Sequence, residues 1–398
     1  MRAIKTKPKL LFVVHGYNNK AGVEEHVKLL VSYLRNNYQI SVCFPDGNSI
    51  VLMQDGAGLL RYPGDQIDLI APYHTQKSEW AFAQILNRVS PDIIHFEHFL
   101  NWPLSIIDQA TAKGVPVVVN FHDYYALTPS YTMQGAENPL ELVSKDYSLQ
   151  YFDADISDYL ISRRNNLIRS FRYVKKLIVP SQYLAEQLQQ VFPYKFTVIE
   201  NGIKPFTIQD PSRNWTGLRF GYIGTMQPQK GWEMLLEAFG DVQAEFPDAQ
   251  LHIYGGVPDP SYKRPNISFH GLYKRSELPK ILSNINVGVI PSLFPETYSL
   301  VLSELWQGHV VPLVSDIGAM KARVDDGING KKFKAGDKAS LVAALKWFLQ
   351  NEDWKSWQLP KPRYVNAMGA DYNAIYQDLL QEHFSADQSL SEPLVQNG

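Results

Sequence analysis

Glu296 and Glu304 stand eight positions apart, directly after the short apolar run 287–290. The run predicts a buried strand, Pro291 and Pro295 predict a loop, and the hydroxyl side chains that follow can cap a helix. Glu296 would then lie just before a helix, with Glu304 about two turns inside it. Free N–H groups at a helix start stabilise an anion, and the two carboxylates could accept hydrogen bonds from hydroxyls on either side. A nucleotide-sugar meets both demands.

A second candidate phosphate contact is Lys230, six residues after Gly224 and just before a predicted helix. A lysine there can pair with phosphate oxygens as they gain charge, whereas a solvated lysine in a turn is the alternative interpretation. Gly255 follows another predicted strand. A glycine at that position would let the backbone approach a nucleobase or ribose closely.

His122 follows a predicted strand and should point into a cleft from the strand's carboxyl end. It could hydrogen-bond a hydroxyl of either reactant, or it could be a structural histidine that caps the next turn. Asp123 could fix its orientation or bond elsewhere in the loop, and we place Asp123 and Tyr124 on the acceptor side. Gly16 and Gly22 in the first turn of the chain are further candidates for that side.

These segments resemble those of the family 4 glycosyltransferases, retaining enzymes of the GT-B fold. The resemblance covers most of residues 10–350 and is stronger in the second half. It implies that His122 and Glu296 act at the reacting centre, with Glu296 on the donor sugar and Glu304 on the ribose. The donor-binding residues that it implies are Lys230, Gly224, Thr225, Thr297, Tyr298, Ser299, Leu300, Glu304 and Gly255.

The chain departs from the family pattern at two places. Thr225 stands where relatives often carry an arginine, so either another residue supplies the second positive charge or backbone amides hold more of the diphosphate. Arg219 and Lys321 cannot be placed from sequence. Ala21-Gly22 replaces a pair of adjacent glycines. A non-catalytic GT-B scaffold therefore remains an alternative, as does a GT-B sugar-nucleotide epimerase or phosphorylase.

Short apolar runs alternate with amphipathic stretches in both halves, which predicts an α/β protein with parallel sheets covered by helices. The resemblance implies the GT-B arrangement of two Rossmann-like domains facing across a cleft. Expected strands are 9–14, 40–44, 92–96, 115–120, 177–180, 196–200, 218–223, 250–254, 267–269, 287–290 and 310–314. Expected helices are 23–35, 79–89, 182–191, 231–243, 276–282, 299–306, 339–349 and 372–383.

The predicted boundaries are an acceptor-binding domain at 1–203 and a donor-binding domain at 215–365. The polar, proline-punctuated stretch 203–214 is interpreted as the linker. Helix 372–383 is expected to pack back onto the first domain, as in other GT-B proteins. The polar tail 385–398 is expected to be disordered.

Composition restricts the partners. The 398 residues include 38 basic and 40 acidic side chains, and this balance does not favour a nucleic-acid partner. One cysteine, Cys43, excludes internal disulfides, and no run approaches the roughly 20 apolar residues of a membrane span. We expect a cytoplasmic protein, soluble or peripheral at the inner face of a membrane, without cofactor or metal. The Asp-x-Asp triplet at 153–155 and the His/Glu run 95–98 are weak metal patterns.

Segment 162–176 carries six basic residues, no acid and an apolar face. It could lie on an anionic membrane or meet a lipid-diphosphate acceptor, or it could be a packed helix with a solvated basic face. The expected partners are therefore a nucleoside-diphosphate sugar and a saccharide or lipid-linked saccharide. The setting would be polysaccharide or glycolipid assembly.

Overall fold

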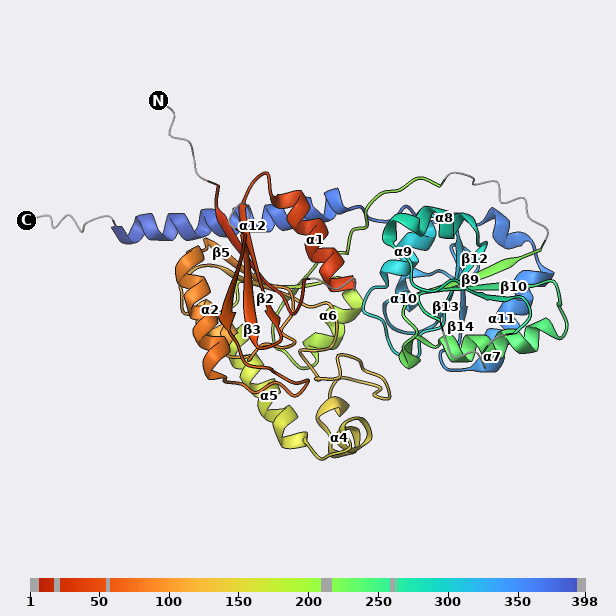
Figure 1. Ribbon diagram of the computed structural model, residues 1–398, viewed down its shortest axis with the longest axis horizontal. Helices are drawn as coiled ribbons and strands as arrows, with labels where there is room; N and C mark the ends of the chain where they lie inside the picture. The colour runs from red at the N-terminus through yellow and green to blue at the C-terminus, as the bar shows by residue number, and fades with distance from the viewer. Residues whose placement is uncertain are drawn as a thin grey trace, which may run out of the picture. The chain divides into compact units, whose positions relative to one another are not determined.

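The computed structural model describes residues 7–17, 22–54, 58–208, 217–257, 262 and 264–391. These residues form two compact units (Figure 1). Unit 1 contains the described residues up to Gly202 and those from Val365 onward, and unit 2 contains Ile203–Tyr364. The chain therefore leaves unit 1 once and returns to it at its C-terminal helix.

Unit 1 is built on one eight-stranded sheet with the order β4-β3-β2-β1-β5-β6-β7-β8. Its strands are β1 (Lys9–Val13), β2 (Gln39–Asp46), β3 (Ser49–Gln54), β4 (Gly58–Pro63), β5 (Ile93–Phe96), β6 (Val117–Asn120), β7 (Lys176–Val179) and β8 (Phe196–Val198). Its helices are α1 (Gly22–Leu34), α2 (Gln76–Val89), α3 (Ile106–Thr111), α4 (Lys145–Phe152), α5 (Ser157–Phe171), α6 (Gln182–Gln189) and α12 (Val365–Ser391).

Six strands of unit 1 pair in parallel, as the alternation of strands and helices predicts. β3 and β4 pair antiparallel and were not expected. Between β2 and β3 the chain reverses through Gly47 and Asn48, with Gly47 at a positive φ of 60°. The sequence Asp46-Gly47 between two apolar runs is a hairpin signal that could have been recognised.

Both faces of this sheet are covered, because alternate side chains of a strand point to opposite sides. In β1, Leu11 and Val13 join the apolar core beneath α2, α3, α5 and α6. Leu10 and Phe12 join a second core with α1 and α12. The continuous apolar run at the start of the chain thus reflects a central strand buried on both sides.

Unit 2 is built on a six-stranded parallel sheet with the order β11-β10-β9-β12-β13-β14. Its strands are β9 (Arg219–Ile223), β10 (Gln250–Tyr254), β11 (Ile267–Phe269), β12 (Val287–Ile290), β13 (Val311–Ser315) and β14 (Lys331–Phe333). Its helices are α7 (Trp232–Gln243), α8 (Leu278–Ser283), α9 (Leu300–Gln307), α10 (Gly318–Arg323) and α11 (Lys338–Gln350). The short elements β14 and α10 were not expected. Helices α7 and α11 cover one face, and α8, α9 and α10 cover the other.

The C-terminal helix α12 belongs to unit 1 and packs along α1 (Figure 1). Its side chains Tyr372 and Tyr376 are fully buried in the core shared with α1. The helix runs to Ser391, so the expectation of a disordered tail was wrong for 385–391, while 392–398 lie outside the described residues.

The expected linker 203–214 does not begin as an exposed segment in the structure. Ile203 is buried, and its N–H donates to the carbonyl oxygen of Arg363 at 3.0 Å. Ile203 therefore pairs with the returning chain inside unit 2. Residues 209–216 lie outside the described residues.

Candidate functional site

The predicted phosphate contacts of unit 2 lie where its strand order reverses. β9 pairs with β10 on one side and with β12 on the other, so the turns that follow β9 and β12 leave the sheet as neighbours. The turn after β9 carries Lys230, and the loop after β12 carries Glu296. The Lys230 ammonium donates to the Glu296 carboxylate at 2.9 Å across 66 positions of sequence.

Gly231 makes this approach possible. Its φ is +71°, a conformation that favours glycine, and a Cβ at this position would lie 1.9 Å from the carbonyl oxygen of Pro291. The Leu293 N–H also donates to the carbonyl oxygen of Gln229 at 2.9 Å. The turn and the loop are thus in direct backbone contact, and any larger residue than glycine at 231 would separate them.

The Glu296 carboxylate is buried but well supplied with donors. It accepts from the Ser292 hydroxyl at 2.5 Å and from Lys230. Burial acts to raise its pKa, but the Lys230 charge and the two hydrogen bonds outweigh that effect and hold the pKa of Glu296 below its ordinary value. Its backbone carbonyl accepts from Ala319 N–H at 2.8 Å, which ties the loop to α10. The carboxylate is therefore ionised and fixed in place.

Glu304 lies in the second turn of α9 and is 2% exposed. Its carboxylate is paired with the guanidinium of Arg275, a residue of the short 3₁₀ helix Arg275–Glu277 before α8. Sequence reasoning missed Arg275, because nothing in the local pattern connects a surface arginine with a glutamate 29 positions later. The second carboxylate is therefore also held by a cation.

The start of α9 is organised differently from the prediction. Ser299 precedes the first helical residue, Leu300, with a φ of 67° and makes no capping hydrogen bond, so the expected hydroxyl cap was wrong. Instead Arg323 donates to the carbonyl oxygens of Tyr298 at 2.6 Å and Ser299 at 2.9 Å, and to the Ser303 hydroxyl at 2.8 Å. Its guanidinium also lies 3.8 Å from the centre of the Tyr298 ring. Arg323 holds the segment between the two glutamates in one conformation.

Two predicted glycines meet at the carboxyl ends of β9 and β10. Gly255 has a φ of +126°, and a Cβ there would lie 1.8 Å from the carbonyl oxygen of Gly224. Thr225 is exposed, and its carbonyl oxygen accepts from the Tyr222 hydroxyl at 2.6 Å. Thr297, between the glutamates, is half-buried. The structure thus brings the predicted donor-binding residues of unit 2 to one edge of its sheet.

The structure also places the two cations that sequence could not. Arg219 begins β9, at the opposite end of the strand from the turn, and donates to the Asn284 side chain at 2.5 Å. Lys321 is exposed on α10. The arginines that contact Glu304 and the segment between the glutamates are instead Arg275 and Arg323.

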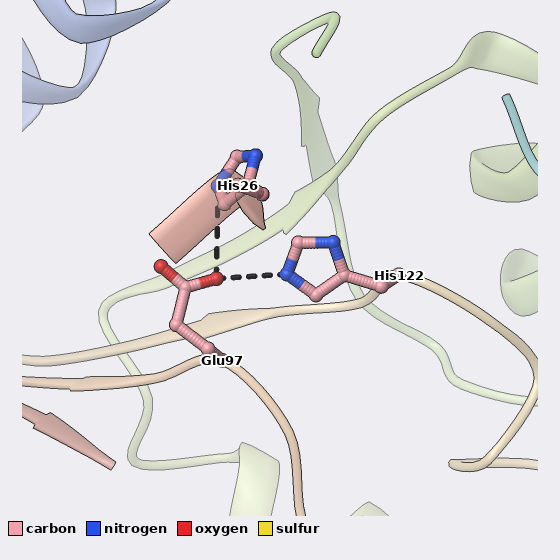
Figure 2. Close-up of side chains that lie close together, drawn as sticks. All are labelled: His26, Glu97 and His122. Carbon is pink, nitrogen blue, oxygen red and sulfur yellow. Dashed lines mark hydrogen bonds and ion pairs between the residues drawn. The ribbon is translucent and has the colours of Figure 1, made fainter. Parts of the chain in front are cut away.

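In unit 1 the polar residues gather around one buried carboxylate, Glu97, directly after β5 (Figure 2). The ring nitrogen Nε2 of His122 lies 2.8 Å from Glu97 Oε2, and that of His26 lies 3.7 Å from the same oxygen. The Asn120 amide donates to this oxygen at 2.9 Å. His95 Nδ1 lies 3.5 Å from the other carboxylate oxygen. Sequence reasoning placed Glu97 at a strand end and did not connect it with His122.

His26, Glu97 and His122 offer ligand atoms close enough together for a metal ion (Figure 2). The amide nitrogen of Asn120, however, lies 3.4 Å from His26 Nε2, 2.9 Å from Glu97 Oε2 and 3.2 Å from His122 Nε2. The amide of Asn120 thus places a hydrogen-bond donor in the middle of the three ligand atoms. Such a donor stabilises a buried carboxylate that has no lysine or arginine beside it. We interpret the cluster as a hydrogen-bonded network around Glu97.

Asp123 and Tyr124 directly follow His122 in the sequence. Asp123 accepts from the Tyr125 N–H at 2.8 Å and lies 3.0 Å from His98 Nε2, so of the two alternatives it bonds elsewhere in the loop. Tyr124 is fully buried in the apolar core of unit 1, and its placement on the acceptor side stays a prediction. Aromatic residues after a strand can serve the core or a ligand, and sequence alone does not separate these roles.

The first turn of the chain is partly described. Gly16 is buried after β1, and Gly22 is exposed as the first residue of α1. Residues 18–21, between these candidates, lie outside the described residues. His15 Nε2 lies 3.4 Å from the buried carboxylate of Glu24 in α1, which extends the set of polar side chains at this edge of the sheet.

Four histidines of unit 1 are held in the neutral form. Burial lowers the pKa of His122 and of His15 to about 3, in each case reinforced by the nearby His98. Burial likewise lowers the pKa of His26 and His95 to about 4, against the opposing charge of Glu97. At neutral pH these rings therefore donate through one nitrogen and accept through the other.

The basic segment 162–176 falls mainly on α5 and packs into the core of unit 1. Its apolar residues Leu167 and Phe171 lie in the core, and Arg163 is buried, donating to the carbonyl oxygens of Tyr125 and Ala126. This matches the packed-helix interpretation. Among the described residues no helix is long and apolar enough to cross a bilayer. Asp155, from the weak metal pattern, accepts from the Ser157 N–H at 3.2 Å at the start of α5.

Two family models match the chain, one in each half. The model described as Glycosyltransferase Family 4 matches residues 20–205, and the model described as Glycosyl transferases group 1 matches residues 217–351. The first match ends and the second begins within 15 residues of Gly202, where the structure divides into units.

Among curated proteins, the chain is similar to two mycobacterial proteins named phosphatidyl-myo-inositol mannosyltransferase. That of Mycobacterium leprae is 28% identical over 151 residues, which is 36% of this chain and 38% of the relative. That of Mycolicibacterium smegmatis is 24% identical over 136 residues, which is 33% of this chain and 35% of the relative. The chain matches little more than a third of the length of these relatives.

Solved structures match over nearly the whole chain. HepE of Anabaena, solved with UDP and glucose, has a TM-score of 0.58 at 15% identity. The alignment covers 97% of this chain and 100% of the HepE chain. A glycosyltransferase of Rickettsia africae has a TM-score of 0.65 at 14% identity, covering 94% and 99%. At such identities the similarity concerns the fold, which is that of the GT-B proteins with two Rossmann-like domains.

Proposed function

The chain belongs to the family 4, group 1 glycosyltransferases, and from this membership we propose that it transfers a sugar from a nucleoside diphosphate to a hydroxyl acceptor. The observation that carries the proposal is the arrangement after β9 and β12, where Lys230 and Glu296 meet at a strand-order reversal. Ligands of open parallel sheets bind at such reversals. A buried ionised carboxylate beside a half-exposed ammonium can bind sugar hydroxyls and a phosphate next to each other.

In the proposed mechanism, Glu296 orients the donor sugar through its hydroxyls and Glu304 binds the ribose hydroxyls. The ammonium of Lys230 and the backbone N–H groups around Leu300 stabilise the departing diphosphate, where negative charge develops in the transition state. The bond from the anomeric carbon to the diphosphate oxygen breaks as the bond to the acceptor oxygen forms. The leaving phosphate oxygen takes the acceptor proton, and the anomeric configuration is retained, as the family resemblance implies.

His122 completes the proposed catalytic residues from unit 1. As a neutral ring it could accept a hydrogen bond from a hydroxyl of the donor sugar or of the acceptor. The curated relatives are named for mannosyl transfer to a phosphatidylinositol, and HepE was solved with UDP-glucose. In keeping with these names we propose a nucleoside-diphosphate sugar as donor and a saccharide or lipid-linked saccharide as acceptor, in polysaccharide or glycolipid assembly.

Thermal stabilisation by a panel of nucleoside diphosphates and their sugars tests the donor site. A ligand that binds only the folded state at 100 times its Kd stabilises by about 2.7 kcal/mol, so one diphosphate should raise the Tm. Lys230→Ala and Glu304→Ala should each abolish most of that rise. Lys334→Ala is the matched control, because the side chain of this lysine is 80% exposed. The variant should keep the rise in Tm.

Release of free nucleoside diphosphate from the stabilising nucleotide-sugar then tests transfer. We expect release that depends on an added acceptor and that continues in EDTA. Stabilisation without any release, across saccharide and lipid-linked acceptors, would favour a non-catalytic GT-B scaffold. No stabilisation by any nucleotide would overturn the proposal itself.

A further inference from the structure

Glu97 is the most completely buried carboxylate near His122, and its surroundings determine how that histidine carries its proton. Glu97 is 0% exposed, and no lysine or arginine is paired with it among the described residues. A buried carboxylate without a cation must be stabilised by hydrogen-bond donors. The donors within reach of Oε2 are the Asn120 amide at 2.9 Å and the His122 ring at 2.8 Å.

Both N–H groups of the Asn120 side chain donate to acceptors other than His122. One donates to Glu97 Oε2 and the other to the hydroxyl of Tyr372 at 2.8 Å. The opposite orientation of the amide would bring its oxygen against the carboxylate, which is repulsive. The 3.2 Å approach of Asn120 to His122 Nε2 is therefore a contact between neighbours. The proton on His122 must then sit on Nε2, where it is donated to Glu97.

This assignment decides what His122 can do with its other nitrogen. With the proton on Nε2, Nδ1 carries the lone pair and accepts a hydrogen bond from a hydroxyl. Figure 2 shows the ring with one nitrogen directed at Glu97 and the other directed away from it. The Glu97 acceptor at 2.8 Å therefore selects this tautomer.

The support for Glu97 comes from the far end of the chain. Asn120 and Tyr372 are 252 positions apart in sequence and both are buried. Tyr372 lies on α12, so the docking of the C-terminal helix places a hydroxyl against the amide that donates to Glu97. One turn further along, the Tyr376 hydroxyl lies 2.6 Å from His95 Nδ1. The helix thus contributes to the order of the polar network under His122.

We propose that Glu97 is a positioning residue, which fixes His122 as the Nε2-protonated tautomer so that Nδ1 accepts from a reacting hydroxyl, and that Asn120 and Tyr372 hold Glu97 in place. The proposal rests on the proposed function, because it assumes that His122 contacts donor or acceptor. A comparable loss of tautomer control or a displacement of about 1 Å costs on the order of 100-fold or more in rate in other enzymes.

Substitutions at Glu97 test whether the accepted hydrogen bond is what matters. Glu97→Leu removes the acceptor and should lower kcat by about 10- to 100-fold with little change in donor KM. Glu97→Gln keeps the shape of the side chain and one acceptor oxygen, so most of the lost kcat should be recovered. The nucleotide-induced rise in Tm, which depends on unit 2, should persist in both variants.

A paired substitution tests the part played by α12 without altering a charge. Tyr372→Phe removes the hydroxyl on Asn120 and should lower kcat by about 3- to 10-fold, the equivalent of one ordinary hydrogen bond. Tyr38→Phe is the matched control. The Tyr38 hydroxyl donates to the side chain of Asn373 on the same helix at 3.0 Å and is not a partner of Glu97 or Asn120 in the network described above. This variant should leave kcat within about twofold, as for a hydrogen bond outside the network. These variants also keep the proposal testable if Glu97→Leu does not fold.

The ¹⁵N chemical shifts of the His122 ring, assigned by difference with His122→Asn, report the tautomer directly. We expect a protonated Nε2 in the unaltered protein and a mixture in Glu97→Leu. The proposal is overturned if Nδ1 carries the proton, if Glu97→Gln is as slow as Glu97→Leu, or if Tyr372→Phe turns over normally with an unchanged His122 signal. It is also overturned if the purified protein holds one equivalent of metal that Glu97→Gln loses. If nucleotides fail to stabilise even the unaltered protein, the proposed function fails instead.

Discussion

At the scale of single residues, the two units stabilise buried carboxylates in different ways. In unit 2, Glu296 is paired with Lys230 and Glu304 with Arg275. In unit 1, Glu97 is held by uncharged donors. A cation beside Glu296 is also a ready contact for a phosphate, whereas neutral donors around Glu97 leave no charge to attract one. The difference is consistent with the proposed division into a unit that binds the donor diphosphate and a unit whose His122 accepts a hydrogen bond from a hydroxyl.

Alanine substitutions at two glycines can distinguish the cost of backbone strain from the cost of a steric clash at the turn that carries Lys230. Gly231 and Gly336 have nearly the same φ, +71° and +72°, but a Cβ at 336 would have no atom within 4 Å. We expect Gly336→Ala to cost about 1–2 kcal/mol in the free energy of unfolding through left-handed strain alone. Gly231→Ala should cost clearly more and should abolish the nucleotide-induced rise in Tm, because Lys230 moves from Glu296.

Urea unfolding and thermal shift measure the two effects. Equal losses of stability in the two alanine variants, with the nucleotide response kept in both, would contradict the contact between the turn and Pro291.

At the scale of elements, α10 and α9 act together. Both are short, with six and eight residues, and neither would be stable alone. Arg323 at the end of α10 ties them together through three hydrogen bonds and the Tyr298 ring. The geometry of the amides at the start of α9 therefore depends on a helix that the sequence did not predict.

Arg323→Lys should weaken nucleoside diphosphate binding by about 10-fold, because an ammonium cannot reproduce the planar fork that bridges two carbonyls and a hydroxyl. Titration calorimetry with the diphosphate identified by thermal shift measures the Kd. Lys321→Ala, an exposed change on the same helix, is the control and should leave the Kd unaltered. A Kd that is the same in Arg323→Lys would show that the start of α9 does not hold the phosphates.

At the scale of the whole molecule, the buried histidines of unit 1 couple stability to pH. His15 and His122 have a pKa of about 3, and His26 and His95 have a pKa of about 4, all because burial disfavours the charged ring. In the unfolded chain the same groups titrate near 6.5, so between about pH 6.5 and 4 the unfolded state binds more protons. Stability must therefore fall as pH falls through this range.

Each such histidine contributes roughly 1.4 kcal/mol per pH unit to the slope. Urea unfolding at intervals between pH 7 and pH 5 should show this fall, and His26→Gln should make it shallower by about one histidine's share. His74→Gln, at a ring that is 71% exposed, is the control for removing an imidazole. A slope that is the same in His26→Gln and in the unaltered protein would show that His26 is not buried as a neutral ring.

Much of the framework followed from the sequence, because it depends on local patterns. The apolar runs at β1, β9 and β12 are central strands of parallel sheets, buried on both faces, and they have no competing interpretation. The glycines after β9 and β10 and the glutamates around α9 were recognisable by type and spacing. The antiparallel strands β3 and β4 and the short α10 were missed, since brief elements are stabilised by their neighbours more than by their own residues.

The sequence by itself therefore determined the two α/β halves, their family and the residues that carry charge at the edge of the second sheet. Only the tertiary structure decided how those residues are paired. Strand order placed Lys230 against Glu296, α10 brought Arg323 to α9, and α12 brought Tyr372 to Asn120 and so to Glu97. These pairings join positions up to 252 residues apart. No local pattern encodes them, because they follow from which elements share a sheet edge or a core.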